Sequence, residues 1–283
     1  MLLRLLLLTP PIVRAALETI QNGLQVRPRT VQVSPALDVT IYELAQPREL
    51  VELWMGGDGG AAVGALNRGS TSTHDPFGVV LWPGAHLAAR MLDTNRNAVS
   101  GQSVLALGAG TGLECLMAAR LGAARVLACD ISPLALALLR HGAEKAGLSD
   151  RVETQVLDLF SDEAVPAADV LVCADLLYNP ELATQVGRRC GEALTAAAAR
   201  GSPLSLLVTD SQRFSGGGDS FTTGLLAQLP ESRREAAEVA FAWQTTHLEQ
   251  ITGSGILIDE DQTNDWSVKF ISQWPAPSYA GWV

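Results

Sequence analysis

The stretch that decides the fold is VLALGAGTGLE, residues 104–114, which is followed by RVLACD, residues 125–130. The first stretch reads as a buried strand that runs through three glycines into a helix, and the second reads as the next strand. Gly108, Gly110 and Gly112 allow a sharp backbone turn and let a ligand approach the main chain closely. The order of strand, glycine loop, helix and strand predicts a nucleotide-type site.

The second strand ends in Asp130, 22 residues after Gly108. A carboxylate there can accept hydrogen bonds from both ribose hydroxyls of an adenosine group. A dinucleotide site needs a third glycine where Leu113 stands, whereas the spacing here is G-x-G-x-G. That spacing is associated with S-adenosyl-L-methionine. A tight turn without a ligand is the alternative, and the ordered elements around the loop argue against it.

Short apolar runs alternate with helix-length segments through most of the remaining chain. Such a pattern is typical of a parallel sheet covered on both faces. We therefore predict a doubly wound, Rossmann-like α/β fold with a seven-strand sheet whose last strand is antiparallel. The expected strands are residues 103–107, 125–130, 152–157, 168–174 and 204–209, and the expected helices are residues 113–121, 133–146 and 181–199. Residues 238–244 and 267–273 are expected to form an antiparallel pair that closes the sheet.

The predicted domain organisation is an N-terminal extension, residues 1–74, before the α/β domain, residues 75–283. Residues 32–44 alternate well enough for one or two strands. Residues 55–76 are rich in Gly, Ser and Thr and read as a surface loop. The first 17 residues favour either a short packed helix or a weak mitochondrial presequence. We expect a cytoplasmic protein, with the mitochondrion as the alternative.

The charge and composition of the chain disfavour several classes of partner and site. The chain has 283 residues, 20 Lys+Arg against 30 Asp+Glu and a formal net charge of −10, which disfavours nucleic acid as the main partner. No apolar run approaches the roughly 18 residues of a membrane span. The four cysteines show no CxxC spacing and the four histidines lie far apart, so we expect no metal site and buried thiols in a reducing compartment.

Two further strand ends carry candidate residues. Asp158 follows the third strand, where it can accept the adenine amino group; an N-cap is the equally open alternative. The fourth strand leads through Ala174 into Asp175 and Tyr178, and the ends of parallel strands face the ligand. The DLLY turn lacks the paired prolines of the Asp/Asn-Pro-Pro-Tyr turn in base-modifying amino-methyltransferases, which disfavours base methylation.

Several motifs together resemble one family: DPFGVVLWPGAH, the glycine loop, a D-x-x-Y turn followed by NPELA, and TDSQRF after the fifth strand. Over residues 75–221 the chain resembles the seven-strand S-adenosylmethionine-dependent protein methyltransferases of the lysine-methylating branch, in particular the electron transfer flavoprotein β-subunit lysine methyltransferase group. The resemblance implies S-adenosyl-L-methionine as cofactor and a protein lysine as acceptor. It places Trp82 beside the cofactor, Asp175 as an orienting acceptor and Tyr178 as a wall of the acceptor pocket.

One departure keeps alternatives open. The family carries an acid two residues before the first glycine, and this chain has Ala106. The rival functions are methylation of a small-molecule amine or RNA, an NAD(P)-binding oxidoreductase and a catalytically silent cofactor-binding module. His86 is expected on a helix surface. Asp210 and Arg213 are expected either to touch the substrate or to form surface ion pairs.

Overall fold

The computed structural model describes residues 17–20, 23–47, 77–252, 255 and 262–274. The Gly-rich segment at residues 55–76, the first 16 residues and the predicted domain boundary at 74/75 lie outside this part of the chain. In the described part, no helix combines the length and apolar character that crossing a bilayer requires.

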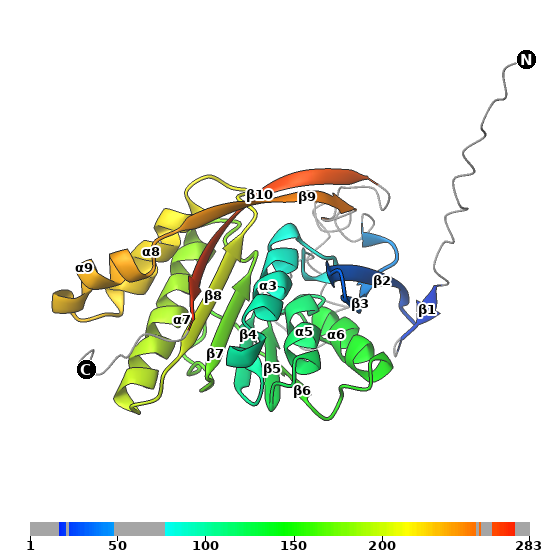
Figure 1. The fold of residues 1–283 in the computed structure, drawn as a ribbon, viewed down its shortest axis with the longest axis horizontal. Coiled ribbons are helices and arrows are strands. Elements are labelled where there is room, and N and C mark those ends of the chain that lie inside the picture. The colour runs from blue at the N-terminus through cyan, green and yellow to red at the C-terminus, as the bar shows by residue number, and fades with distance from the viewer. Residues whose placement is uncertain (1–16, 21–22, 48–76, 253–254, 256–261, 275–283) are drawn as a thin grey trace, which may run out of the picture.

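A seven-stranded sheet forms the centre of the molecule, in the order β6-β5-β4-β7-β8-β10-β9 (Figure 1). Strands β4 to β8 run parallel, and β10 is antiparallel to both β8 and β9. The predicted doubly wound fold with an antiparallel last strand is therefore confirmed. The strands are β4 (Ser103–Leu107), β5 (Arg125–Asp130), β6 (Val152–Val156), β7 (Val170–Ala174), β8 (Ser205–Asp210), β9 (Gln244–Thr252) and β10 (Thr263–Gln273).

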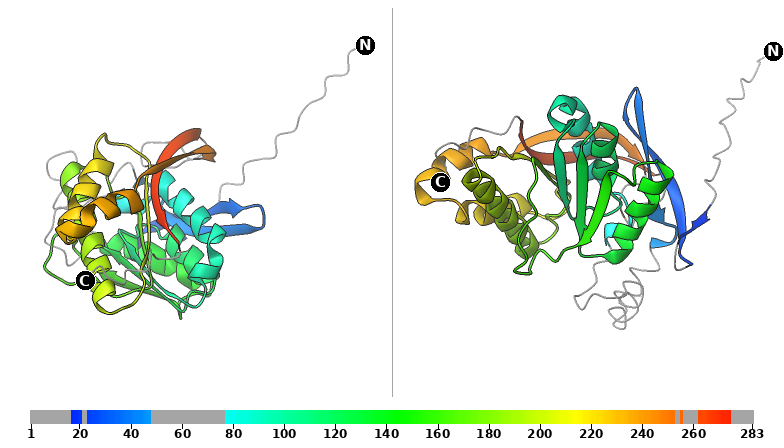
Figure 2. Two further views of the ribbon diagram at one scale, coloured as in Figure 1. Left: turned by 60° about the vertical axis from the view of Figure 1, so that its left-hand side comes forward. Right: turned by 90° about the horizontal axis from the view of Figure 1, so that it is seen from below.

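Helices cover both faces of the sheet (Figures 1 and 2). In β4, Val104 and Ala106 join one buried cluster while Leu105 and Leu107 join the other, as the alternation of a strand requires. The first cluster includes residues of α3 (Pro83–Thr94), α5 (Leu113–Arg120) and α6 (Pro133–Lys145); the second includes residues of α7 (Pro180–Ala199), α8 (Gly217–Ala227) and α9 (Glu231–Ala240). The short elements η1 (Phe77–Val79) and α4 (Arg96–Val99) flank α3.

Local signals fix where two helices begin. The hydroxyl of Ser132 accepts a hydrogen bond from the backbone N–H of Ala135 at 3.2 Å, and α6 starts with a proline at its first position. Asn179 caps α7 in the same way, accepting from the N–H of Leu182 at 2.8 Å. These caps satisfy N–H groups that a helix start leaves without a partner.

The described N-terminal residues form a small sheet of β1 (Glu18–Thr19), β2 (Gln25–Ser34) and β3 (Leu37–Leu44). Val31 and Ile41 from this hairpin join the same buried cluster as α3 and α5. Figure 2 shows the blue hairpin and the orange-to-red β9–β10 pair on the same side of the molecule as α3. The hairpin therefore shares a core with the α/β unit, and the division at 74/75 stays a prediction.

Two sequence expectations are wrong. Residues 238–240 belong to α9, and the partner strand of β10 begins only at Gln244. The sequence ESRREAAEVA consists mostly of good helix formers, and buried Ala237 anchors it. His86 is buried rather than on a helix surface, because the strands on the outer side of α3 cover it.

Candidate active site

The glycine loop adopts the conformation that its sequence indicates. Gly108, Gly110 and Gly112 have φ angles of 65°, 51° and 76°, the left-handed region that side chains disfavour. A Cβ atom at Gly108 would lie 2.2 Å from a Leu176 methyl group, and one at Gly112 would lie 2.2 Å from a Leu139 methyl group. Glycine is therefore favoured at both positions, because the φ angles disfavour other residues and a Cβ atom would displace a leucine side chain.

Asp130 ties this loop to the end of β5. Its Oδ2 accepts a hydrogen bond from the N–H of Gly110 at 2.9 Å, and its Oδ1 accepts from the N–H of Ser132 at 2.8 Å. The side chain is buried. The predicted ribose-binding role is compatible with this geometry, and it stays a prediction.

The turn η1 brings a residue that sequence reasoning missed. A Cβ atom at Gly78 would lie 3.7 Å from the Cα of Gly110 and 3.8 Å from Oδ2 of Asp130. Gly78 thus covers the glycine loop, and any larger residue would fill the space beside the carboxylate. Its place in the DPFG motif was the available signal.

The chain forms a turn at Asp158, the residue predicted to contact adenine. Asp158 is half-buried and lies two residues beyond β6, and its Oδ1 accepts a hydrogen bond from the N–H of Phe160 at 2.9 Å. No helix follows it, so it does not serve as an N-cap. Phe160 is 51% exposed beside it. Ala174 ends β7, and whether these residues contact the cofactor stays a prediction.

Asp175 is buried in a network that joins three elements. Its Oδ2 accepts from the N–H of Gly84 at 2.5 Å, and its Oδ1 accepts from the N–H and the hydroxyl of Ser211 at 2.8 and 2.7 Å. Its φ of 59° is in the left-handed region. The carboxylate therefore holds the start of α3 against the segment after β8. This geometry favours a positioning role for Asp175 over direct contact with an acceptor nitrogen.

Three aromatic rings and a cation gather beside this network. The ring of Phe77 makes edge contacts with those of Trp82 and Tyr178, at centroid distances of 6.1 and 5.9 Å. The Cζ of Arg213 lies 3.7 Å from the centre of the Trp82 ring and 5.7 Å from that of Tyr178. Arg213 also donates to the backbone oxygen of Asp175 at 2.9 Å. We call Phe77, Trp82 and Tyr178 the aromatic box.

Two more carboxyl groups near the site have raised pKa values. Burial, the largest cause, raises the pKa of Glu114 to about 7, with a further contribution from the charge of Asp130. Burial likewise raises the pKa of Asp210 to about 6, and the neighbouring charge of Asp175 adds to the effect. Glu114 was missed at the sequence level, although a lone acid in the apolar helix LECLMAA was a usable signal.

Metal-binding groups are not clustered in the described residues, where no three His, Cys, Asp or Glu side chains come together. The four cysteines are free and buried. Cys173 and Cys190 approach to 3.7 Å between their sulfur atoms without forming a disulfide.

Comparison with known proteins now decides the family. Residues 69–211, about half of the chain, match the family described as lysine methyltransferase. This chain belongs to the lysine methyltransferase family. The matched range contains the glycine loop, Asp130, the aromatic box and Asp175, so the resemblance drawn from the sequence is confirmed. The expected cofactor, S-adenosyl-L-methionine, agrees with this family.

Relatives match over part of their length. The human electron transfer flavoprotein beta subunit lysine methyltransferase is 34% identical over 111 residues, which are 38% of this chain and 41% of the relative. A ribosomal protein L11 methyltransferase from Escherichia coli is 34% identical over 104 residues, 37% of this chain and 34% of the relative. The chain thus spans about two fifths or less of these relatives. A 16S rRNA methyltransferase from T. thermophilus in complex with AdoMet and guanosine has a TM-score of 0.43 and 18% identity, covering 87% of this chain and 50% of that chain.

Proposed function

We propose that this protein transfers a methyl group from S-adenosyl-L-methionine to the side-chain amine of a lysine in another protein. The observation that carries the proposal is the aromatic box, which already holds a cation next to the glycine loop. Phe77 contacts both other rings of the box, and the following residue, Gly78, lies against Gly110 and Asp130. The proposed donor site and the proposed site for a cationic acceptor are therefore in contact with two consecutive residues of η1.

The chain's own residues account for binding the donor. The three left-handed glycines add no side chains to the loop, and the carboxylate of Asp130 lies against Gly110 at the end of β5, where it can bind ribose. When bound, S-adenosyl-L-methionine supplies an electrophilic methyl group on a sulfonium. No residue has to form a covalent intermediate, so the protein mainly aligns the acceptor and excludes water.

The aromatic box accounts for selecting and preparing the acceptor. A lysine ammonium is attracted to aromatic faces, as the guanidinium of Arg213 is in this structure. The amine must lose a proton before it attacks, and its pKa in water is about 10.4. Desolvation between the rings lowers that pKa, since burial disfavours the charged form, and this effect has to exceed the opposing attraction of the ammonium to the ring faces. Arg213 has to leave the face of Trp82 when a lysine enters.

Asp175 keeps this geometry in place without touching the acceptor. It fixes Gly84, two residues after Trp82, and its backbone oxygen holds Arg213. A Cβ atom at Gly84 would lie 2.8 Å from the Asp175 carboxyl group, which explains the glycine in the WPG motif.

The proposal is tested by incubating the full chain with donor labelled in its methyl group and a cell extract. We expect label in protein, released by acid hydrolysis as methylated lysine, and none with a Trp82→Ala variant that retains its fold. Label that survives protease treatment as a nucleotide or metabolite would instead identify RNA or a small-molecule amine as acceptor. Donor binding without any labelled product would favour a silent cofactor-binding module.

The relatives suggest which proteins to test first. The relatives' names mention the electron transfer flavoprotein beta subunit and ribosomal protein L11 as targets, so both purified proteins are suitable first acceptors. We also propose that the protein acts in the cytoplasm. The free thiols of Cys173 and Cys190, 3.7 Å apart, support a reducing compartment.

A further inference from the structure

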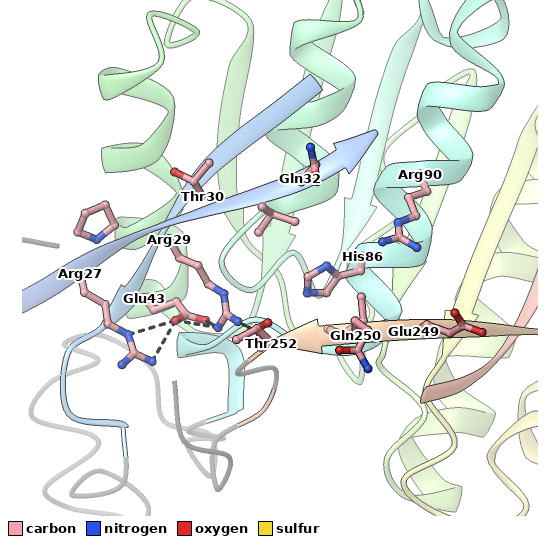
Figure 3. A pocket seen from close by; sticks show the side chains of 13 residues that line it. Arg27, Arg29, Thr30, Gln32, Glu43, His86, Arg90, Glu249, Gln250 and Thr252 are labelled. Carbon is pink, nitrogen blue, oxygen red and sulfur yellow. Dashed lines mark hydrogen bonds and ion pairs between the residues drawn. The ribbon is translucent and has the colours of Figure 1, made fainter. Parts of the chain in front are cut away.

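A cavity of about 530 Å³ lies on the outer side of α3, between β2 and β9 (Figure 3). Residues 27–32 of β2 and residues 249–252 of β9 line its two sides, and the remaining lining residues are Glu43, His86 and Arg90. Neither the glycine loop nor the aromatic box contributes to this lining. We call this cavity the β2–β9 groove; it is distinct from the candidate active site.

The edges of two strands face the β2–β9 groove. Successive side chains of a strand point to opposite faces, so a cavity above one face is lined by every second residue. Here six consecutive residues of β2 and four of β9 form the lining, which places the strand edges and their main-chain groups at the cavity. In β2, β1 pairs only with Gln25 and Val26, while β9 is the last strand of its sheet. Within the described residues, no strand pairs with the outer edge of either stretch, although the Arg29 guanidinium donates a hydrogen bond to the main-chain oxygen of Thr252 at the end of β9.

A buried polar group without a partner faces the same space. His86 is 7% exposed, and its Nε2 has no hydrogen-bond partner among the described residues. Burial, together with the charges of Arg29 and Arg90, lowers the pKa of His86 to about 3, so the ring is neutral at physiological pH. Figure 3 shows the ring of His86 and the guanidinium of Arg90 reaching from α3 into the space between the two strands. Because buried polar atoms normally have partners, this nitrogen indicates a ligand with hydrogen-bonding groups.

The groove also has the opposite charge from the molecule as a whole. Three arginines, Arg27, Arg29 and Arg90, line it against the glutamates Glu43 and Glu249. Glu43 is 1% exposed and is paired with both Arg27 and Arg29, so it offsets part of their charge. With three arginines against two glutamates, the lining has a formal charge of +1 in a chain of net charge −10. Such a surface complements an acidic ligand.

We propose that the β2–β9 groove binds an extended, acidic segment of the protein acceptor as an added strand along the outer edge of β2. Main-chain groups of this segment pair with β2, one of them also meets His86, and its acidic side chains meet Arg90. The inference rests on the proposed function, since it names how the protein acceptor is held.

A physical connection links the groove to the candidate active site. Glu43, held by Arg27 and Arg29, accepts a hydrogen bond from the N–H of Leu81 at 2.8 Å, and Leu81 directly precedes Trp82. His86 and Trp82 lie at the same end of α3. An acceptor docked in the groove is thus held beside the segment that carries the aromatic box.

Fluorescence anisotropy with the full chain, in the absence of methyl donor, tests the inference. The probe is a fluorescein-labelled octapeptide of alternating Glu and Thr. Two comparison peptides alternate Lys with Thr, which reverses the charge, and Glu with Pro, which keeps the charge but removes every second N–H donor. Arg90→Glu is the test variant. Arg188→Glu, on exposed α7 residue Arg188, makes the same charge change on the other face of the sheet.

We expect the Glu-Thr peptide to bind, Arg90→Glu to weaken it by about tenfold or more, and Arg188→Glu to change it less than about twofold. The Glu-Pro peptide should bind at least about fivefold more weakly, because a strand without its N–H groups cannot pair fully. Thermal unfolding confirms that Arg90→Glu is folded, and His86→Leu provides a second variant that should also weaken binding.

Equal affinity for the Glu-Thr and Glu-Pro peptides would show that the groove attracts charge without adding a strand, and would overturn the inference. Equal effects of Arg90→Glu and Arg188→Glu, or tighter binding of the Lys-Thr peptide, would overturn it as well. Methyl transfer to protein by a chain that binds none of these peptides would refute the groove and leave the proposed function standing. Peptide binding without any methyl transfer would refute the proposed function and leave peptide binding in the groove standing.

Discussion

Replacing Asp175 with Asn tests whether this carboxylate holds the site together. The carboxylate accepts from the N–H of Gly84 through one oxygen and from Ser211, twice, through the other. An asparagine has a single oxygen. If that oxygen accepts the hydrogen bonds from Ser211, the amide NH₂ replaces Oδ2 opposite the N–H of Gly84, which now lies 2.5 Å from it. Two donors would then face each other.

The cost follows from these contacts. A buried N–H without a partner costs about 1–3 kcal/mol, and losing the charge from two further hydrogen bonds adds about 1 kcal/mol. We therefore expect Asp175→Asn to lower the free energy of unfolding by about 3 kcal/mol. For a chain of this size, that corresponds to a fall in Tm of roughly 6–12 °C. Turnover should fall as well, because the side chain at position 175 no longer holds Gly84, at the start of α3, in its place beside Trp82.

A matched control exists at the opposite end of the sheet. Asp169 accepts from the N–H and the hydroxyl of Ser103 at 2.8 and 2.6 Å through one oxygen, Oδ2. Asp169→Asn can keep both hydrogen bonds and loses only their charge, so we expect a loss of stability of about 1 kcal/mol and normal turnover. Urea unfolding followed by circular dichroism measures the two variants side by side. An Asp175→Asn protein as stable as Asp169→Asn, with normal turnover, would refute the positioning role.

Three further predictions concern single side chains. The folded state raises the pKa of Glu114 from 4.5 to about 7, so the protonated carboxyl stabilises the protein at low pH. The free energy of unfolding of wild type should therefore fall by up to about 3 kcal/mol relative to that of Glu114→Gln as the pH rises from 4.5 to above 7. A difference in urea unfolding that does not change with pH would contradict this. Gly112→Ala should weaken donor binding and destabilise more than Gly147→Ala, since both have positive φ but only the first places a Cβ against Leu139; equal Tm values would argue against the close approach. Tyr178→Leu should lower turnover by about tenfold, more than Tyr178→Phe, because the ring face binds the cation; the reverse order in a kinetic assay would assign the role to the hydroxyl.

Much of the fold was predictable because its signals are local. Strands β4 and β5 and helix α6 match the expected ranges to within a residue, since apolar runs, glycines and the Ser-Pro cap act on their own neighbourhood. The prediction of a strand at residues 238–244 was wrong because it gave the apolar residues of this segment more weight than its helix-forming composition. Here the propensity of the ESRREAAEVA segment was the better guide.

The partners of the candidate site residues could not be predicted from the sequence. The partners of Asp175 lie 91 and 36 residues away in the chain, so spacing alone could not show that its carboxylate is already occupied. His86 is buried because β2 and β9 cover α3, a tertiary contact that no local pattern reveals. The cation on Trp82 likewise comes from Arg213, which lies five helices and five strands further along the chain.

Calorimetric titration of S-adenosylhomocysteine into wild type and into Asp130→Ala tests the central claim most directly. The claim is that the glycine loop and Asp130 hold the nucleoside of a methyl donor. We predict binding to wild type, no binding of NADH, and a loss of about 100-fold in affinity for folded Asp130→Ala, as two hydrogen bonds to a charged group would give. Unchanged affinity in Asp130→Ala, or NADH binding in place of S-adenosylhomocysteine, would contradict the claim.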